Sequence, residues 1–279
     1  MTLAYHLVHH PCWSNKRTEL WERIHLPVAK ACNVKCSYCQ SQNSSCHIPM
    51  PGSCQDILGP EESLIVLSHY LEKKPNLRIV GFAGPGDPLF NEETFETIEL
   101  VRDSFPEMRL CLSTNGILLE KNVKRLEKLE VSTISVSMSS IRPTTASKIY
   151  EWAFIDGKIS SGFEMAKDII DRQVRGIVSA KGAGIHVKVN TILIPKLNSD
   201  EVVELAATLA NLGVDLQNIL PLVPLDCMSS MIPPTFPQLL QARKDAGVYL
   251  KQFVHCHQCR SDVVGIPGKD DVLDLGYLI

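Results

Sequence analysis

The chain has 279 residues, of which 44% are hydrophobic and 21% charged, and its formal net charge is −3. This composition supports a folded globular protein, and the small net charge excludes a broad basic surface for nucleic acid. The N-terminus lacks the pattern of a signal peptide and no apolar run is long enough for a membrane span, so we predict a cytoplasmic protein without nucleic-acid or membrane partners.

In chain order, residues 1–54 show no regular pattern apart from a strand around 23–29, and the following sequence alternates strongly. Helical periodicity is present over 61–75, 91–105, 120–130, 162–180 and 199–213. Short apolar runs typical of buried strands lie between these helices, over 77–84, 108–116, 132–140, 186–195 and 216–224.

About six strand–helix units favour an α/β fold with a parallel sheet, and they are too few for a closed eight-fold barrel. We therefore predict a partial (βα)6 TIM-like barrel within a single domain, residues 1–279. The barrel core (25–225) would carry an irregular N-terminal extension (1–24) and a C-terminal tail (226–279). The proline-rich stretch 224–237 predicts a loop, and the sequence after His255 predicts irregular coil.

Cysteine is the unusual component of the composition, because the chain has ten, six of them within residues 1–54. Disulfides do not persist in the reducing cytosol. Cysteines in this number therefore indicate metal ligands or catalytic thiols.

The densest group is the Cys-x3-Cys-x2-Cys motif formed by Cys32, Cys36 and Cys39, with Tyr38 before the last cysteine. Three thiolates on one loop can hold three corners of a [4Fe–4S] cube and leave one iron open. A zinc site would need a fourth ligand from elsewhere, and three inert core cysteines are a further alternative. The loop follows the first predicted strand, where α/β enzymes place their chemistry.

Two later stretches end predicted strands with residues suited to ligand binding. "AGPGDPL" supplies Gly84, Gly86 and Asp87, and glycine permits close approach of the backbone to a ligand. "LSTNG" supplies Ser113 and Asn115 at the end of the next strand. Each stretch alone could be an ordinary turn between a strand and a helix.

Taken together, these motifs resemble the radical S-adenosylmethionine (radical SAM) superfamily. The resemblance implies a resident [4Fe–4S] cluster on the three loop cysteines, which reductively cleaves SAM to a 5′-deoxyadenosyl radical. It also implies a set of SAM-binding residues: Tyr38, Gly84, Gly86, Asp87, Ser113, Asn115 and, from strand alternation, Lys188.

Further potential ligands lie outside the loop. Cys256 and Cys259 form a Cys-x2-Cys pair that indicates a metal site, without the second pair of a zinc knuckle. Cys111 could instead be a small buried residue in its apolar strand, and His25 could form a hydrogen bond in the core. Cys12 and Cys46 complete this set.

The ordered set of motifs closely resembles the NifB family of nitrogenase cofactor maturases. The landmarks are "HPC", "RIH", "AGPGDPL", "LCLSTNG", "VKVNTILIP" and "CHQCRSDVVG". The resemblance implies three [4Fe–4S] clusters in all, with one substrate cube on His25, Cys46 and Cys111 and another on Cys12, Cys256 and Cys259. Such enzymes fuse these two cubes with a sulfur and a SAM-derived carbide into an eight-iron precursor of the nitrogenase cofactor.

The same resemblance implies partners: an iron–sulfur cluster donor, cofactor carrier or scaffold proteins of nitrogenase assembly, and an electron donor such as ferredoxin or flavodoxin, in an anaerobic cytoplasm. Many family members carry an additional C-terminal carrier domain, and this chain resembles the form without it. Cys46 lies one residue further from the loop than is usual in the family, so nearby Cys54 could replace it. Cys227 is expected to be structural.

Two other functions are compatible with parts of the pattern. A different radical SAM enzyme could use the additional cysteines for auxiliary clusters in peptide or small-molecule modification. A non-catalytic iron–sulfur scaffold could also use them, but it would not need the glycine-rich and "STNG" turns.

Overall fold

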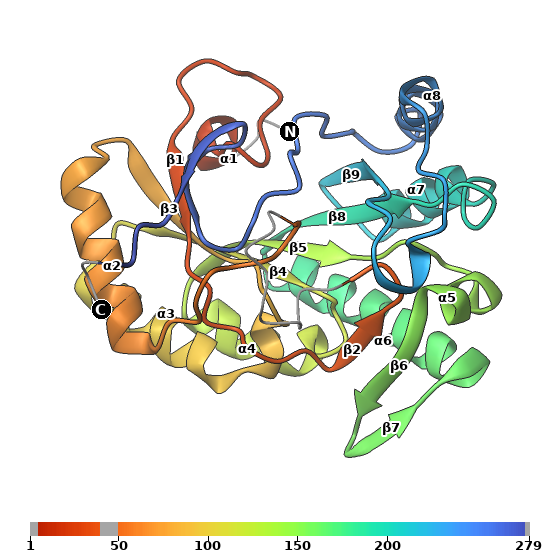
Figure 1. Ribbon diagram of the computed structural model, residues 1–279, viewed down its shortest axis with the longest axis horizontal. Helices are drawn as coiled ribbons and strands as arrows, with labels where there is room; N and C mark the ends of the chain where they lie inside the picture. Colours follow the sequence, from red (N-terminus) through yellow and green to blue (C-terminus); the bar gives the residue numbers. More distant parts are fainter. Residues whose placement is uncertain (1–4, 40–49, 277–279) are drawn as a thin grey trace.

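A mostly parallel sheet of eight strands forms the centre of the protein in the computed structural model, which describes residues 5–39 and 50–276 (Figure 1). The strand order is β11-β10-β1-β3-β4-β5-β8-β9. Six of these strands are parallel: β1 (Glu22–His25), β3 (Leu77–Phe82), β4 (Arg109–Thr114), β5 (Val131–Ser137), β8 (His186–Leu193) and β9 (Leu216–Pro221). The predicted partial barrel of six units is confirmed.

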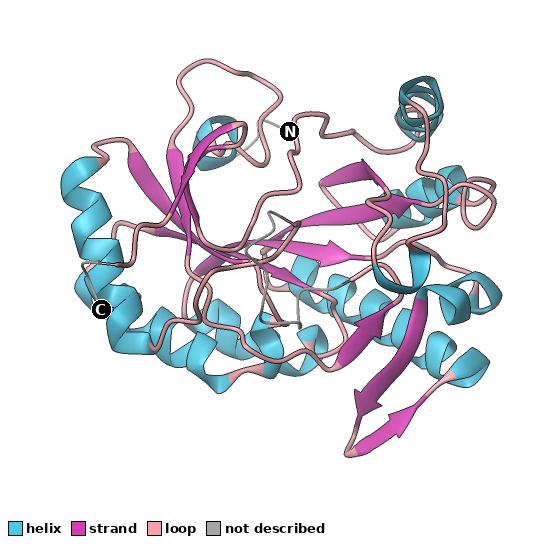
Figure 2. Ribbon diagram, viewed as in Figure 1, coloured by secondary structure: helices cyan, strands magenta, loops and turns pink. Residues whose placement is uncertain are grey.

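Each parallel strand is followed by a helix: α2 (Pro60–Lys73), α3 (Glu92–Ser104), α4 (Leu119–Lys128), α6 (Gly162–Gly182), α7 (Val202–Asn211) and α8 (Phe236–Ala246). Figure 2 shows α2, α3, α4 and α6 side by side along one side of the sheet. The strand residues that face these helices are fully buried and apolar, as Ile24, Leu112 and Val136 illustrate. Because apolar residues occupy that face, the polar residues of the same strands point to the opposite face.

The N- and C-terminal segments cross this opposite face, where the red and blue parts of the chain meet in Figure 1. The N-terminal segment begins with the short helix α1 (Tyr5–His9). Phe253 of the C-terminal segment packs with Leu7 and Trp13 in a small apolar cluster of its own, away from the main core. Segments from the two ends of the chain therefore come together over the sheet.

A second, three-stranded sheet was not predicted from the sequence. It consists of β2 (Val34–Cys36), β6 (Tyr150–Ile155) and β7 (Lys158–Ser160), and β6 follows the short helix α5 (Pro143–Ile149). Strand β2 has three residues and contains a cysteine, so it carried no recognisable strand pattern.

One sequence prediction for the C-terminal part was wrong and a second was incomplete. Residues 263–272 are not coil but the hairpin β10 (Val263–Ile266) and β11 (Lys269–Val272), which pairs antiparallel with β1. The loop predicted over 224–237 contains the 3-10 helix η2 (Asp226–Met228), and α8 begins at its end, with Thr235 capping the helix. Another 3-10 helix, η1 (Pro88–Phe90), precedes α3. Within the described residues, the helices are too short or too polar to cross a membrane.

Candidate active site

The three loop cysteines line a cavity of about 160 Å³ at the carboxyl end of the first parallel strands. Cys36 is the last residue of β2, where the pairing with β6 holds it opposite Tyr150. The loop then turns back, because the backbone N–H of Cys39 donates to the carbonyl of Cys36 over 3.0 Å. Nζ of Lys35 closes the turn by donating to the carbonyl of Cys39 over 2.7 Å. The sequence thus brings Cys32, Cys36 and Cys39 together through local structure.

The glycine-rich turn packs directly on the beginning of this loop. The backbone N–H of Gly86 donates to the carbonyl of Ala29 over 2.6 Å, and that of Asp87 to Ala31 over 2.9 Å. A Cβ atom at Gly86 would lie 2.1 Å from the carbonyl oxygen of Ala31, which is too close for any side chain. Glycine at this position is therefore required for contact between the turn and the loop.

Asp87 joins this turn to the end of β4. Its carboxylate accepts hydrogen bonds from the backbone N–H groups of Leu89 (2.9 Å) and Asn115 (2.6 Å) and from Oγ1 of Thr114 (2.8 Å). Burial raises the pKa of Asp87, and these hydrogen bonds oppose the rise. Since both carboxylate oxygens accept bonds from the protein, Asp87 holds the walls of the cavity in place.

Asn115 connects the same strand end to the cysteine loop. Its Nδ2 donates to Oδ1 of Asn33 over 2.7 Å and lies 3.8 Å from the sulfur of Cys32. Of the predicted SAM-binding residues, the smaller cavity is lined by Tyr38, Gly86, Asp87, Ser113 and Asn115. Gly84, with φ of +136°, directly precedes the lining residue Pro85.

Burial of the Cys32 and Cys36 thiols disfavours their charged form. Burial raises the pKa of Cys32 to about 12, with a smaller contribution from the nearby Asp87 carboxylate. Burial also raises the pKa of Cys36 well above its ordinary value. A cationic cluster would have to displace these protons on binding, as thiolate metal sites do.

The donor set of the smaller cavity fits a [4Fe–4S] cube with one open iron. The lining includes three thiols, and the Asp87 carboxylate already accepts hydrogen bonds from the protein. Three thiolates leave the fourth iron without a protein ligand. The glycine-rich turn and the end of β4 border the same space, where a second ligand of that iron could bind.

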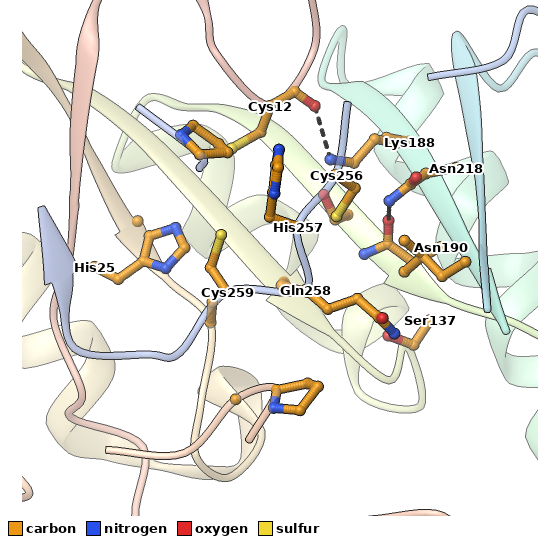
Figure 3. Close-up of a pocket in the computed structure, with 18 of the residues that line it drawn as sticks. Cys12, His25, Ser137, Lys188, Asn190, Asn218, Cys256, His257, Gln258 and Cys259 are labelled. Atoms are coloured by element: carbon orange, nitrogen blue, oxygen red, sulfur yellow. Dashed lines mark hydrogen bonds between the residues drawn. The ribbon is translucent and has the colours of Figure 1, made fainter. Parts of the chain in front are cut away.

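A larger cavity of about 270 Å³ lies next to the first, and both are lined by Tyr38, Ala83, Ser113 and Ser137. The larger cavity brings together five of the six other predicted ligands, namely Cys12, His25, Cys111, Cys256 and Cys259. Figure 3 shows Cys12, Cys256 and Cys259 around one space, with His25 facing it from β1. The sixth predicted ligand, Cys46, lies outside the described residues.

His25 has the hydrogen-bonding arrangement of a metal ligand. Nδ1 donates to the carbonyl of Arg260 over 3.2 Å, so Nε2 carries the free electron pair. Burial lowers the pKa of His25 to about 3, and the positive charge of Arg23 adds to the effect, so the ring is neutral. A Cβ atom at Gly81 would lie 2.7 Å from Cδ2 of the ring, so this glycine makes room for the imidazole.

Lys188 lines the larger cavity only, whereas Tyr38, Gly86, Asp87, Ser113 and Asn115 all line the smaller one. Its Nζ donates to the carbonyl of Cys12 over 2.9 Å and lies 5.6 Å from the ring centre of Trp13 and 5.4 Å from that of Phe253. The side chain is 4% exposed. Lys188 therefore places a buried positive charge beside the cysteines of the N- and C-terminal segments.

A polar wall of this cavity was largely missed by the sequence analysis. Ser135 and Ser137 of β5 face it together with Asn190 of β8 and Asn218 of β9. Nδ2 of Asn218 donates to Oδ1 of Asn190 over 2.9 Å, and Oδ1 of Asn218 accepts no hydrogen bond from the described residues. Polar residues at every second position of these strands were the available signal.

The cysteine pair of the C-terminal segment is anchored through the residues that follow it. The guanidinium of Arg260 donates to both carboxylate oxygens of Asp262 over 2.7 Å, and Nη1 donates to Oγ of Ser53 over 3.2 Å. Cys54 contacts Ser261 of this anchor and does not line either cavity. Cys227 is exposed and also lies outside both cavities.

Comparison with known proteins identifies the family of the chain. The family model of the radical SAM superfamily matches residues 26–209. The FeMo cofactor biosynthesis protein NifB of Methanocaldococcus jannaschii is 41% identical over 95% of this chain and 88% of its own length. The NifB protein of Klebsiella pneumoniae is 35% identical over 94% of this chain and 57% of its own length.

Solved structures support the fold. The crystal structure of Streptococcus suis SuiB has a TM-score of 0.61 at 13% identity, covering 85% of this chain and 50% of that chain. A radical SAM methyltransferase from Sphaerobacter thermophilus has a TM-score of 0.58 at 16% identity, covering 83% of this chain and 65% of that chain. With the cysteine loop, the glycine-rich turn and the similarity over nearly its whole length, the chain belongs to the NifB family within the radical SAM superfamily.

Proposed function

We propose that this chain is a radical SAM maturase of nitrogenase cofactor biosynthesis. Its substrates would be two [4Fe–4S] cubes, which it fuses with a sulfur and a carbide derived from the methyl group of SAM. The product would be the eight-iron precursor of the FeMo cofactor. The observation that carries the proposal is the grouping of five potential iron ligands in one cavity beside the cavity of the cysteine loop.

As a radical SAM enzyme, the chain uses a [4Fe–4S] cluster and SAM. When bound and reduced, the cluster supplies the electron for cleavage of SAM. We assign Cys32, Cys36 and Cys39 as its ligands, and the donor set of the smaller cavity supports this. Gly84, Gly86, Ser113 and Asn115 would orient SAM, with Asp87 holding that wall through its three hydrogen bonds.

The larger cavity would bind the two substrate cubes. We assign His25, Cys46 and Cys111 to one cube and Cys12, Cys256 and Cys259 to the other. Three protein ligands leave one iron of each cube open to a bridging atom. The neutral His25 ring, with Nδ1 on a backbone carbonyl, supports its role as a ligand through Nε2. Tyr38 and Ser113 would lie between SAM and the substrate, since both line both cavities.

The partners follow from this function. A role in nitrogenase cofactor biosynthesis implies contact with iron–sulfur and nitrogenase assembly proteins. We propose a cluster donor, a carrier or scaffold that accepts the product, and a ferredoxin or flavodoxin as electron donor. Since such clusters are oxygen-sensitive, we place the reaction in an anaerobic cytoplasm.

Iron and acid-labile sulfide per chain after anaerobic reconstitution test the proposal. We expect about twelve irons in the parent chain and about eight in a Cys12→Ala/Cys256→Ala variant. Cys227→Ala is the matched control, because this exposed cysteine lies outside both cavities, and it should retain all of the iron. About four irons in both the parent and the double variant would contradict the nine-ligand assignment.

A further inference from the structure

Arg23 lies behind Cys259, which lines the larger cavity, and makes an unusual set of contacts. The side chain is 1% exposed, and it is among the largest fully buried side chains of the protein. Nη1 donates to the carbonyl of Gly265 over 2.6 Å. Nη2 lies 2.8 Å from Oδ2 of Asp270 and 3.1 Å from the sulfur of Cys259, so it donates to both a carboxylate and a thiol.

The position of Arg23 on β1 explains how it reaches this thiol. Arg23 and His25 are two residues apart, so both point to the cavity side of the sheet, while Ile24 packs in the apolar core. Arg23 pairs with Gly265 of β10, and β11 of the same hairpin brings Asp270 to the guanidinium. The hairpin therefore holds the arginine from one side and leaves its other side to Cys259.

Burying an arginine is costly unless its charge is paired and its N–H groups are satisfied. A structural ion pair with Asp270 would pair the charge of Arg23 without any contact with a thiol. Here Nε is buried and has no hydrogen-bond partner among the described residues, so this position of the side chain leaves one of its N–H donors unpaired. The arrangement instead keeps one N–H of the fixed guanidinium on the sulfur of Cys259.

We infer that Arg23 is a positioning residue, which orients Cys259 and supplies positive charge to an iron–sulfur cube bound by Cys12, Cys256 and Cys259. The inference rests on the proposed ligand set. A cube carried by thiolates is anionic after reduction, and hydrogen bonds to its sulfurs together with nearby positive charge favour the reduced state. Asp270 offsets part of the arginine charge, so the Arg23–Asp270 pair would set the reduction potential of this cube.

The two partners of the pair predict shifts of opposite sign. Arg23→Met removes a positive charge and should lower the reduction potential of the cube. Asp270→Asn removes a negative charge at the same place and should raise it. A purely structural ion pair would behave differently, because loss of either partner would weaken the same contact.

The experiment uses the full chain carrying Cys32→Ala/Cys36→Ala/Cys39→Ala, so that the resident cluster cannot form. After anaerobic reconstitution, a redox titration monitored by EPR follows the signal that Cys256→Ala removes. Arg23→Lys keeps the positive charge but lacks the planar set of N–H donors of the guanidinium. The reduction potential should therefore shift less than in Arg23→Met. Arg102→Met is the control, since this partly buried arginine donates to carbonyl groups far from the cavity.

The outcomes separate the inference from the proposed function. If Cys256→Ala removes neither iron nor an EPR signal, the ligand set is wrong and the inference falls with it. If Cys256→Ala removes about four irons but Asp270→Asn does not raise the potential, the ligand set stands and the role of Arg23 is refuted. If Arg23→Met no longer retains the cube, the reduction potential of Asp270→Asn decides alone: a rise supports the role of Arg23, and no rise refutes it.

Discussion

The two cavities hold their potential ligands in different ways. The smaller one takes Cys32, Cys36 and Cys39 from a single loop, which is tied back by Lys35 and by the pairing of β2 with β6. The larger one takes its ligands from the N-terminal segment, β1, β4 and the C-terminal segment. The ligands of the smaller cavity are close together in the sequence, whereas those of the larger cavity come together only once the whole fold has assembled.

This difference suits a resident cofactor and a transient substrate. The loop cysteines would keep their cluster through many turnovers, because one tightly hydrogen-bonded segment carries all three. On the proposed function the larger cavity would have to release its product, and ligands on separate segments would be given up one segment at a time. The segment with Cys256 and Cys259 contacts β9 through Gln258, β1 through Cys259 and the segment near Ser53 through Arg260.

Two variants, each lacking one ligand of one cavity, should show the largest effects on iron content and SAM cleavage. They test whether the two cavities bind their iron independently. Cys36→Ala should abolish SAM cleavage and remove about four irons, leaving about eight in the larger cavity. Cys256→Ala should also lose about four irons but retain SAM cleavage. Iron analysis and chromatography of the cleavage products check both variants. Loss of all iron from Cys36→Ala would mean that the cavities assemble as one unit.

Gly86→Ala tests how tightly the smaller cavity is built. Its Cβ would meet the backbone carbonyl of Ala31 at 2.1 Å, and because the backbone fixes the positions of both atoms, neither can rotate away. We expect a loss of about 3 kcal/mol in the free energy of unfolding, measured by chemical denaturation, together with weakened SAM binding. Gly182→Ala is the control, since no atom lies within 4 Å of its Cβ position, and its stability should be unchanged or slightly increased.

Gly81→Ala is the corresponding change in the larger cavity. Its Cβ would meet the ring of His25 at 2.7 Å, and a side chain can rotate where a carbonyl cannot. The free energy of unfolding should therefore fall by only about 1 kcal/mol, while the displaced imidazole should cost about four irons. An equal loss of stability in Gly81→Ala and Gly86→Ala would contradict the contrast between a rigid and an adaptable cavity.

The sequence predicted the six strand–helix units because their apolar periodicity is a local signal. It predicted the Cys-x3-Cys-x2-Cys loop and the pair Cys256 and Cys259 because their spacing is local too, whereas the full ligand set of the larger cavity came from the family resemblance. It did not predict β2, whose three residues pair with β6 far along the chain, nor the hairpin of β10 and β11. Arg23 shows the same limit. Its contact with Cys259 joins residues 236 positions apart, and no local pattern carries that information.

Lys35→Met tests the tether of the cysteine loop in the smaller cavity, and its effect on the free energy of unfolding should be small. Nζ of Lys35 donates to the carbonyl of Cys39 and forms an ion pair with Asp226, so it tethers the cysteine loop to the segment after β9. The two side chains are 22% and 27% exposed, so solvent screens the pair and the free energy of unfolding should fall by about 1 kcal/mol or less.

The consequence for the cluster should exceed the consequence for stability. Without the tether the loop gains freedom at Cys39, so the resident cluster should be lost faster to a chelator, while iron in the larger cavity should leave at the parent rate. Lys121→Met is the control, because its ion pair with Asp156 is exposed and neither residue lines a cavity. Equal rates of iron loss from both cavities in Lys35→Met would show that the tether does not distinguish the resident site from the substrate site.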